Sequence, residues 1–543
     1  MAKPLIWTQL TAAFAAFFIM AFFAVFIGAC DDLNKPGESG LAITHVDFIA
    51  DGDGQNLFMS GKLVITFNED IHGLKQDDIK LNAAFVIFKH EFTRVGPALY
   101  VLGITPGGAG TVMVGLDPYN PSGWKWKAKK VNVSAVFNFT GTSALTITLY
   151  NRTENTVIPD MIAGIPVIAV GDRAFFNKAI TEVTIPNTIE TIGRLAFSNN
   201  QLSGVDIPAG VKSIGIGAFF SNLLTDVKIS TGLAFIGDEA FNYNQLESIT
   251  IPDSVTSIGR LAFANNRLSN IKIPDNVVYI GQSAFQNNRL ISVDIPKDSE
   301  TIAVGLFSHN LIESLTIPDK VTSIGAYAFE YNRLKDITIP DSVIFIGNIA
   351  FANNILTGIT FNEGLELIGI GAFTYNNLKS IKLPESLKEI RDNAFENNYL
   401  TEIVIPGNVT LIGRNAFANN NLTGVTIEDS VVFIEDRVVF IGDSAFANNN
   451  LTNITIGDGV KSIGAHAFMN NQLTDAAIPD SVVSIGEYAF RNNKLIKITI
   501  GEDVSLGRDA FGGGFEAFYS ANEKKAGRYS RLDVSAEWVY DGI

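Results

Sequence analysis

The sequence is poor in the residues from which most metal and catalytic sites are built. Its 543 residues include one cysteine, Cys30, and five histidines. A single cysteine allows no internal disulfide and no cysteine-based metal cage. The histidines show no HExxH or similar ligand spacing, and they stand far apart at His45, His72, His90, His309 and His466. The sequence therefore predicts a protein that is not an enzyme, with no metal site, no catalytic residues and no cofactor.

Positive charge is also scarce. Lys and Arg number 40 against 56 Asp and Glu, which gives a net charge of −16 and a pI of about 4.8. An acidic surface repels nucleic acid and anionic lipid, so neither is expected as a principal partner. The basic stretch Trp124–Lys130 is interpreted as an edge strand whose lysines block pairing with other chains, rather than as a nucleic-acid site. With 47% hydrophobic and 18% charged residues, the chain is typical of a folded protein.

The N-terminal residues predict a secretion signal and a membrane anchor. An apolar run, Thr11–Ile27, follows a short segment that carries Lys3, as in a secretory signal. The small residues directly before the lone Cys30 resemble the bacterial lipobox. This resemblance implies a signal peptide over residues 1–29, lipidation of Cys30, a tether over residues 30–40 and a lipid-anchored, surface-exposed protein of the cell envelope. The alternative is an uncleaved membrane helix, for which the run is short.

Residues 41–138 alternate apolar and polar positions between turn residues, which predicts a β-sandwich. The expected strands include Leu63–Phe67, Ala84–Phe88, Leu99–Leu102, Thr111–Val114 and Val131–Val133. The segment Lys62–Leu81 (KLVITFNEDIHGLKQDDIKL) resembles bacterial Ig-like modules. That resemblance implies a spacer that lifts the following domain away from the membrane.

The rest of the chain repeats a unit that ends in Ala-Phe. Twelve phenylalanines follow at steps of 22 residues, and four more follow at steps of 29, 22, 22 and 21. They are Phe175, Phe197, Phe219, Phe241, Phe263, Phe285, Phe307, Phe329, Phe351, Phe373, Phe395, Phe417, Phe446, Phe468, Phe490 and Phe511. The step of 29 arises because Val431–Arg437 (VVFIEDR) is nearly duplicated by Val438–Ser444 (VVFIGDS), and the extra segment is expected to bulge.

One unit reads N-x-L-x-x-I-x-I-P-D-x-V-x-x-I-G-x-x-A-F-x-N, and this period predicts a leucine-rich-repeat solenoid of about 16 coils. A single coil cannot fold. Burying its apolar residues contributes about 10–20 kcal/mol, whereas ordering its backbone costs about 20–45 kcal/mol. Stacked coils share a core, so the array folds as a whole. The fold class is therefore mainly β.

The repeated residue types have structural explanations. The phenylalanines predict an internal spine. The Gly four residues before each Phe suits a tight bend, and Ala303 and Arg391 replace it in two coils. The Asn three residues after the Phe is expected to bond the backbone at a corner, so that stacked copies form a ladder.

The repeats resemble the BspA-like leucine-rich repeats of bacterial surface proteins, as in Ile251–Gly259 (IPDSVTSIG) and its copies. The resemblance implies adhesion to host proteins or to other cells, without naming the ligand. The long repeat surface suits an extended extracellular protein or glycan, bound weakly at many points. Within this resemblance, residues 139–174 are expected to form an N-terminal cap and first coil, residues 175–511 the repeats, and residues 512–543 a closing segment.

The ligand surface is expected where strand residues face solvent between the inward Leu and Ile positions. The residue before the last Ile of I-x-I gives a column that is mostly Thr, about 75 Å long. Its candidates for ligand contact are Thr250, Lys272, Asp294, Thr316, Thr338 and Lys382. The column lacks the clustered aromatics of a binding hot spot, so a wet face built of good strand formers is the plainer interpretation.

Three hypotheses for function follow. Adhesion at the cell surface comes first. A structural envelope or spacer protein is the alternative, which the repeated Thr favours. A surface glycan-acting enzyme comes last, because it needs a pair of converging carboxylates, whereas Asp and Glu here stand mostly at turns such as Asp253 and Asp341. The oligomeric state does not follow from the sequence.

Overall fold

The computed structural model describes residues 43–50, 61–67, 79–82, 87–96, 99–106, 110–116, 129–133, 137–140, 144–150, 155–162, 165–429 and 439–542. The predicted signal peptide, Cys30 and the tether lie outside these residues, as does Trp124–Ala128. The described residues form two compact units, and the main boundary between them falls after Val133.

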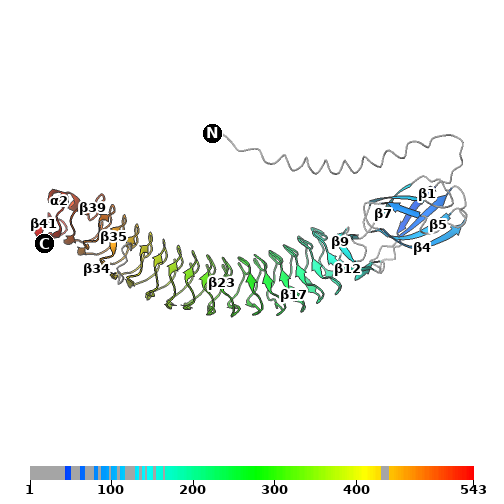
Figure 1. The fold of residues 1–543 in the computed structure, drawn as a ribbon, viewed down its shortest axis with the longest axis horizontal. Helices are drawn as coiled ribbons and strands as arrows, with labels where there is room; N and C mark the ends of the chain where they lie inside the picture. The colour runs from blue at the N-terminus through cyan, green and yellow to red at the C-terminus, as the bar shows by residue number, and fades with distance from the viewer. Residues whose placement is uncertain are drawn as a thin grey trace, which may run out of the picture. The chain divides into compact units, whose positions relative to one another are not determined.

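The first unit consists of antiparallel strands in two sheets. Its elements are β1 (Ile43–Ala50), β2 (Gly61–Phe67), β3 (Ile79–Asn82), β4 (Ile87–Gly96), β5 (Leu99–Pro106), β6 (Gly110–Leu116) and β7 (Lys129–Val133). One sheet has the order β1-β2-β5-β4 and the other β3-β6-β7 (Figure 1). Four of the five strands named from the sequence fall within these elements, and the fifth begins at Ala84, outside the described residues.

The second unit is a stack of coils that curves gently along its length (Figure 1). Most coils have a first strand at the I-x-I position, and all have a second strand at x-I-G. The first strands are β13 (Val183–Thr184), β15 (Gly204–Ile207), β17 (Asp226–Ile229), β20 (Asn270–Lys272), β22 (Ser292–Asp294), β25 (Asp336–Ile339), β27 (Gly358–Phe361), β30 (Glu402–Ile405), β32 (Gly424–Ile427), β34 (Asn453–Thr455), β36 (Asp475–Ala477) and β38 (Lys497–Ile500).

The second strands are mostly two residues long. They are β14 (Thr191–Ile192), β16 (Ser213–Ile214), β18 (Phe235–Ile236), β19 (Ser257–Ile258), β21 (Tyr279–Ile280), β23 (Thr301–Ile302), β24 (Ser323–Ile324), β26 (Phe345–Ile346), β28 (Leu367–Ile368), β29 (Glu389–Ile390), β31 (Leu411–Ile412), β33 (Val439–Ile441), β35 (Val460–Ile463), β37 (Ser484–Ile485) and β39 (Ser505–Leu506). They pair in parallel, each with the strand one coil away. The array is therefore the predicted solenoid.

The two sides of the coil differ in how continuously their strands pair. The second strands belong to a sheet of nine strands, which ends at β21, and a sheet of ten, from β23 to β39. The first strands form short sheets of two to four strands, such as β15-β17 and β25-β27. Proline directly after the first strand removes a backbone donor there, which limits pairing on that side.

The predicted phenylalanine spine is confirmed. The sixteen rings stack from coil to coil with centroids 4.8–5.8 Å apart. Fifteen of them have no exposed surface, and Phe511 at the end is 3% exposed. Each ring therefore contributes its full apolar surface to a core shared by neighbouring coils.

The asparagine ladder is confirmed as well. The Asn266 amide donates to the carbonyl oxygens of Phe241 and Phe263 at 2.9 and 3.1 Å, and its Oδ1 accepts from the Leu246 amide at 3.0 Å. Each bond to Phe241 and Leu246 crosses to the preceding coil. The same contacts recur at Asn200, Asn222, Asn244, Asn288, Asn310, Asn332, Asn354, Asn376, Asn398, Asn420, Asn449, Asn471 and Asn493. These side chains satisfy buried backbone groups at the corner.

The recurrent glycine serves close packing between coils rather than a bend. A Cβ built at Gly347 would lie 2.5 Å from the Ala326 backbone nitrogen of the preceding coil, and at Gly259 and Gly281 it would lie 2.4 Å from backbone. The positive φ angles fall two residues later, at Leu261 (54°) and Ile349 (61°). The bend expected at the glycine is thus two residues away from it.

One junction departs from this packing. Among the described second strands, neighbours pair throughout the stack except β21 with β23. At this coil Ala303 replaces the glycine, and a half-buried Ser299 replaces the buried apolar residue found in other coils, such as Val321. The spine rings on either side of Phe307 are the most widely spaced, at 5.7 and 5.8 Å. The extra Cβ and the missing apolar side chain explain the gap.

Arg391 also replaces the glycine, but there the pairing persists. Strands β28 and β29 remain in register, and the Arg391 amide donates to the Ile368 carbonyl at 3.0 Å. Leu387 fills the apolar position that Ser299 leaves empty at the other junction. Loss of pairing therefore follows when the added Cβ and the lost apolar contact occur in the same coil.

The stack continues across the duplicated segment. Residues 430–438, which include the extra Val431–Arg437, lie outside the described residues. On either side the ladder holds, because Ile412 pairs with Ile441 and the Asn449 amide donates to the Phe417 carbonyl at 3.0 Å. The second copy of the duplication therefore supplies the strand, β33.

Both ends of the stack are closed by elements outside the repeat. Strand β8 (Phe137–Thr140) pairs antiparallel with β9 (Leu145–Tyr150), and β9 joins the nine-stranded sheet through β12 (Ile165–Val170). Two short strands, β10 (Thr156–Val157) and β11 (Met161–Ile162), lie between β9 and β12 in the sequence. Tyr150 stacks on Phe175 at 4.9 Å and continues the spine. Such caps keep the terminal coils from exposing their cores.

The C-terminal cap is aromatic. Helix α2 (Phe515–Ala521) is followed by β40 (Gly527–Ser530) and β41 (Val539–Gly542), which extend the sheet of β38 in antiparallel fashion. Phe515, Tyr519 and Tyr529 are fully buried, and burial raises the pKa of Tyr529 to about 12. The Arg531 guanidinium lies 4.4 Å over the ring of Trp538. These elements lie within residues 512–543, for which the sequence predicts a closing segment.

Candidate functional site

The six residues predicted to contact a ligand are all exposed on the first-strand side of the repeat unit. Lys272, Asp294 and Thr338 lie in strands β20, β22 and β25. Thr250, Thr316 and Lys382 occupy the same position in coils whose first segment is not a strand. The column is therefore continuous in position but interrupted in pairing.

The structure brings three of these six residues together. Thr316, Thr338 and Lys382, with Thr360 between them, line a shallow hollow of about 870 Å³ that spans four coils. Thr250, Lys272 and Asp294 lie outside this hollow. The hydroxyls and the ammonium group offer hydrogen bonds to a ligand laid across the coils, whereas the hollow contains no deep apolar pocket for an anchoring side chain.

Charges on the same column partly neutralise each other. Lys228 lies 3.7 Å from Asp206 one coil earlier, with both side chains more than two thirds exposed. Exposed pairs of this kind contribute little to stability. They leave the first-strand side polar and nearly balanced in charge, which suits many weak contacts rather than one strong one.

A second candidate surface lies at the corner after each spine phenylalanine, and the sequence interpretation missed it. We define the corner surface as the side chains one and two residues after each spine Phe. The residue two after the Phe has positive φ in every coil where both are described, as at Tyr243 (55°), Asn265 (54°) and His309 (56°). Asparagine adopts this conformation more readily than most residues, which explains its frequency here.

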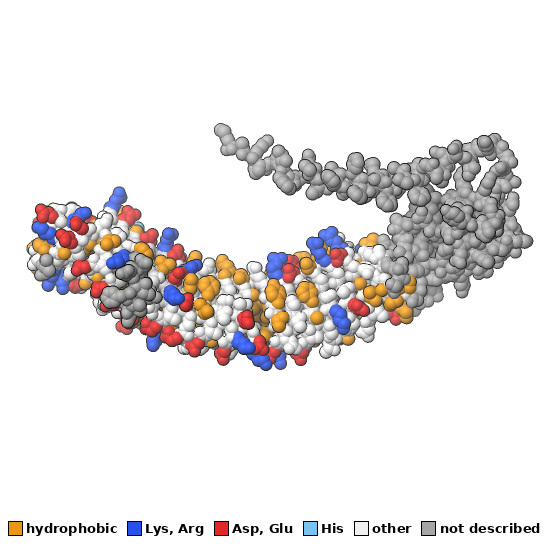
Figure 2. Space-filling model, in the orientation of Figure 1, with side chains coloured by type: hydrophobic (Ala, Val, Ile, Leu, Met, Phe, Trp, Pro, Cys, Tyr) orange, Lys and Arg blue, Asp and Glu red, His pale blue; other side chains and the backbone are white. Residues whose placement is uncertain are grey.

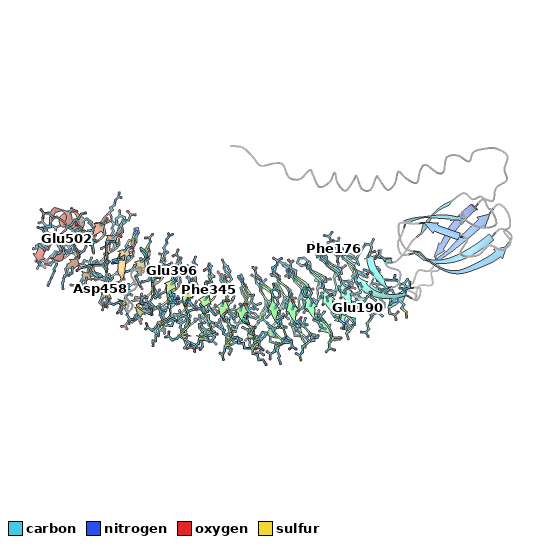
Figure 3. All side chains as sticks on the ribbon, in the orientation of Figure 1. Phe176, Glu190, Phe345, Glu396, Asp458 and Glu502 are labelled. Carbon is cyan, nitrogen blue, oxygen red and sulfur yellow. The ribbon has the colours of Figure 1, made fainter. Side chains whose placement is uncertain are left out.

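Several of these corner positions carry exposed rings in place of asparagine. Tyr243, Tyr331 and Tyr375 are 56%, 50% and 59% exposed. Tyr243 packs edge-on against Phe220 at 5.6 Å, and His309 lies 4.8 Å from Tyr331. Figure 3 shows Phe176 and Glu396, each directly after a spine Phe, on the inner side of the curve, and Glu190 on the outer side. Exposed aromatic side chains typical of a binding surface therefore lie at the corner and not on the first-strand column.

A third set of exposed rings follows the second strands. Phe235, Tyr279, Phe345 and Phe440 each stand directly before the Ile of the second strand and are 36–56% exposed. Figure 2 shows hydrophobic side chains gathered on the middle coils and charged side chains along the outer edge. Polar residues at the same position in other coils, such as Ser257 and Glu389, separate these rings, so they form no continuous apolar groove.

The geometry offers little for catalysis or metal binding. Within the part of the chain that the structure describes, no three His, Cys, Asp or Glu side chains converge as metal ligands. Burial raises the pKa of Glu330, which His309 opposes, but these groups lie on an open corner rather than in a cleft. None of the helices among the described residues is long and apolar enough to cross a membrane.

The coil defines the class of protein. Short parallel strands on two sides, an internal column of phenylalanine rings and a ladder of asparagines make a leucine-rich-repeat solenoid. The sequence profile of the BspA type leucine rich repeat region, six copies long, matches residues 152–267, 234–357, 322–440 and 439–514. The chain belongs to this family.

Solved structures with similar repeats come from several bacteria. A leucine-rich repeat protein from Bacteroides ovatus is 22% identical over 70% of this chain and 91% of its own, with a TM-score of 0.39. A leucine rich cell surface protein from Faecalibacterium prausnitzii is 23% identical over 69% and 97%, with a TM-score of 0.34. The pneumococcal vaccine antigen PcpA is 19% identical over 68% and 96%, with a TM-score of 0.41. No curated protein matches the chain.

Proposed function

We propose that this chain is a non-enzymatic adhesion protein of the bacterial cell surface, whose stack of repeats binds an extended extracellular protein or glycan. One observation supports this most directly: Thr316, Thr338, Thr360 and Lys382 recur on four successive coils and line one common hollow. A ligand that runs along the stack would make a similar polar contact on each coil. Many weak contacts in one rigid row give firm binding overall.

Two further parts of the proposal concern how the repeat unit is held at the surface. The lipobox-like sequence before Cys30 supports a lipid anchor, and the paired antiparallel sheets of the first unit support an Ig-like module that acts as a spacer. A Cys30→Ser variant tests the anchor. It should move the protein from the membrane fraction to the soluble fraction of cells, whereas unchanged membrane association would contradict lipidation at Cys30.

The binding role is tested with soluble residues 41–543, compared with residues 134–543 and 41–133, against matrix proteins, host glycans and bacterial cells. The fragment of residues 134–543 should show saturable binding, as the longer protein does. Binding that follows residues 41–133 would assign the role to the first unit. Absence of binding to every target would favour the alternative, a structural envelope or spacer protein.

A paired substitution locates the surface. Thr316→Val and Thr338→Val remove hydroxyls from the first-strand hollow at constant shape, whereas Thr191→Val makes the same change on the second-strand side, where Thr191 is also exposed. Binding should weaken several-fold in the first two variants and stay unchanged in the third. Equal binding by all three would remove the first-strand hollow from the proposal.

A further inference from the structure

The corner surface contains a second hollow, of about 530 Å³, that spans five coils. Phe220 lines it at one end and His309 at the other, and Tyr243, Asn265 and Asn287 lie between them. The spine rings beneath these coils are 5.4–5.7 Å apart, which is close to the length of one hexose residue per coil. The hollow is thus a short trough that runs along the stack.

Its floor is a chain of side-chain amides. Asn287 Nδ2 donates to Asn265 Oδ1 at 2.7 Å, and Asn265 Nδ2 donates to Asn242 Oδ1 at 2.9 Å. An amide has two donor hydrogens and an acceptor oxygen with two lone pairs. Each of these amides therefore keeps hydrogen-bonding capacity after the chain is made. Groups that both donate and accept match hydroxyl groups, which do the same.

Aromatic rings stand at both ends of the amide chain. Tyr243, held edge-on by Phe220, is 56% exposed, and His309 lies against Tyr331, which is 50% exposed. Exposed Tyr rings offer a flat apolar face and a polar edge. The C–H face of a pyranose ring packs on such a face while its hydroxyls reach the amides.

The charge of the trough favours an uncharged ligand. Its one carboxylate, Glu239, lies 3.3 Å from the Arg260 guanidinium and is neutralised by it. An anionic glycan would find no free cation, and a peptide would find neither an unpaired strand edge nor a deep apolar pocket for an anchor residue.

From these features we infer that the corner trough binds a neutral polysaccharide, with pyranose rings on Tyr243 and His309 and hydroxyls on the amides of Asn265 and Asn287. The inference rests on the proposed extracellular binding role and names the ligand class and the surface. It is independent of the first-strand hollow, because the two surfaces share no residue.

The test uses full-length protein in a detergent without a sugar headgroup, titrated with dextran and yeast mannan, and with heparin and gelatin as anionic and peptide probes. Tyr243→Asn and His309→Asn remove one ring each but install the residue that other coils carry in the same positive-φ conformation, so folding should be unaffected. Tyr375→Asn is the matched control, since Tyr375 has the same position and exposure outside the trough.

At least one neutral polysaccharide should bind, about tenfold more weakly to Tyr243→Asn and His309→Asn than to the parent protein, with Tyr375→Asn unchanged. Asn265→Gly, which keeps the positive φ, should weaken binding as well. No binding of either neutral polysaccharide, or equal losses in Tyr243→Asn and Tyr375→Asn, overturns the inference.

Binding of heparin or gelatin that depends on Tyr243 also overturns it, because the trough would then serve another ligand class. If the parent protein binds cells or matrix proteins but neither neutral polysaccharide, the inference about the corner trough is wrong and the proposed adhesion role stands. If the parent protein binds nothing at all, both fall.

Discussion

On the second-strand side of the repeat unit, described strands pair in sheets of nine and ten, whereas the first strands form sheets of two to four. The same 22-residue repeat makes both sides. The difference lies in what each side touches. The second strand leads into the close-packed glycine, the phenylalanine spine and the asparagine ladder, which set the spacing of the coils. The first strand is followed by proline in most coils and carries the more variable exposed residues.

This contrast divides the coil into a part that determines stacking and a part that is free to vary. Substitutions near the spine and the ladder should cost stability, and the same chemical changes on the first-strand side or at exposed positions should not. Three pairs of substitutions test this division by matching a change on one part with a change on the other, and a double substitution tests the cause of the gap between β21 and β23.

The largest effect is expected from the spine. Phe329→Ala removes a fully buried ring that stacks on Phe307 and Phe351 at 5.8 and 5.3 Å, and should lower the free energy of unfolding by about 3–5 kcal/mol. Phe345→Ala removes a ring that is 36% exposed on the second strand of the next coil and should cost less than about 1 kcal/mol. Urea unfolding followed by circular dichroism measures both. Similar losses in the two variants would contradict a stability centred on the spine.

The ladder comes next. Asn310→Ala leaves the buried Leu290 amide without its acceptor and removes the bonds to the Phe285 and Phe307 carbonyls, which should cost about 2–3 kcal/mol. Thr338→Ala on the first-strand side should change stability by less than about 0.5 kcal/mol. Thermal unfolding of both variants gives the comparison. If Asn310→Ala lowered stability no more than Thr338→Ala, a water molecule would be replacing the Asn310 amide at the corner.

Two glycines should respond in opposite directions. Gly347→Ala places a Cβ 2.5 Å from the Ala326 backbone nitrogen and should destabilise by about 1–3 kcal/mol. Gly204→Ala in β15 meets nothing closer than 3.6 Å and should be neutral or stabilise by about 0.5 kcal/mol, because alanine restricts the unfolded chain. The midpoints of urea unfolding decide the sign. A stabilising Gly347→Ala would show that coil spacing adapts freely.

The smallest effect should come from repairing the gap between β21 and β23. Ser299→Val combined with Ala303→Gly restores the residues found in other coils and should add about 1 kcal/mol of stability. Hydrogen exchange at residues 300–303 should slow as the two sheets join. Unchanged exchange would mean that these two residues do not cause the gap, and each single variant shows which of them contributes more.

The parts of the fold that recur in every coil could be predicted from the sequence. The spine and the ladder follow from phenylalanine and asparagine at a fixed period, because each copy meets the same neighbours. Ala303 stood out as an exception, but its effect depends on Ser299 in the same coil. Arg391 makes the same exchange and keeps the pairing.

The candidate site was harder to predict because it depends on exceptions to the repeat. Thr316, Thr338 and Lys382 share a hollow, while Thr250, Lys272 and Asp294 occupy the same position outside it. Nothing in the repeat distinguishes these two groups. The sequence pattern did not predict the corner trough, because the most regular residue near it is the ladder asparagine one position further along, whose role is structural. The useful signal was the replacement of Asn by Tyr or His where φ is positive, as at Tyr243 and His309.

The ladder also bears on how such a chain changes length over generations. Each asparagine bonds only its own coil and the coil before, so a gene duplication or deletion of one whole repeat leaves every other contact as it was. The bond from Asn449 to Phe417 spans 32 residues where its counterparts span 25, so even an addition that is not a whole repeat is absorbed without loss of the ladder. A bacterium can therefore lengthen or shorten the reach of this protein by copying errors alone, while both caps and the spine remain intact.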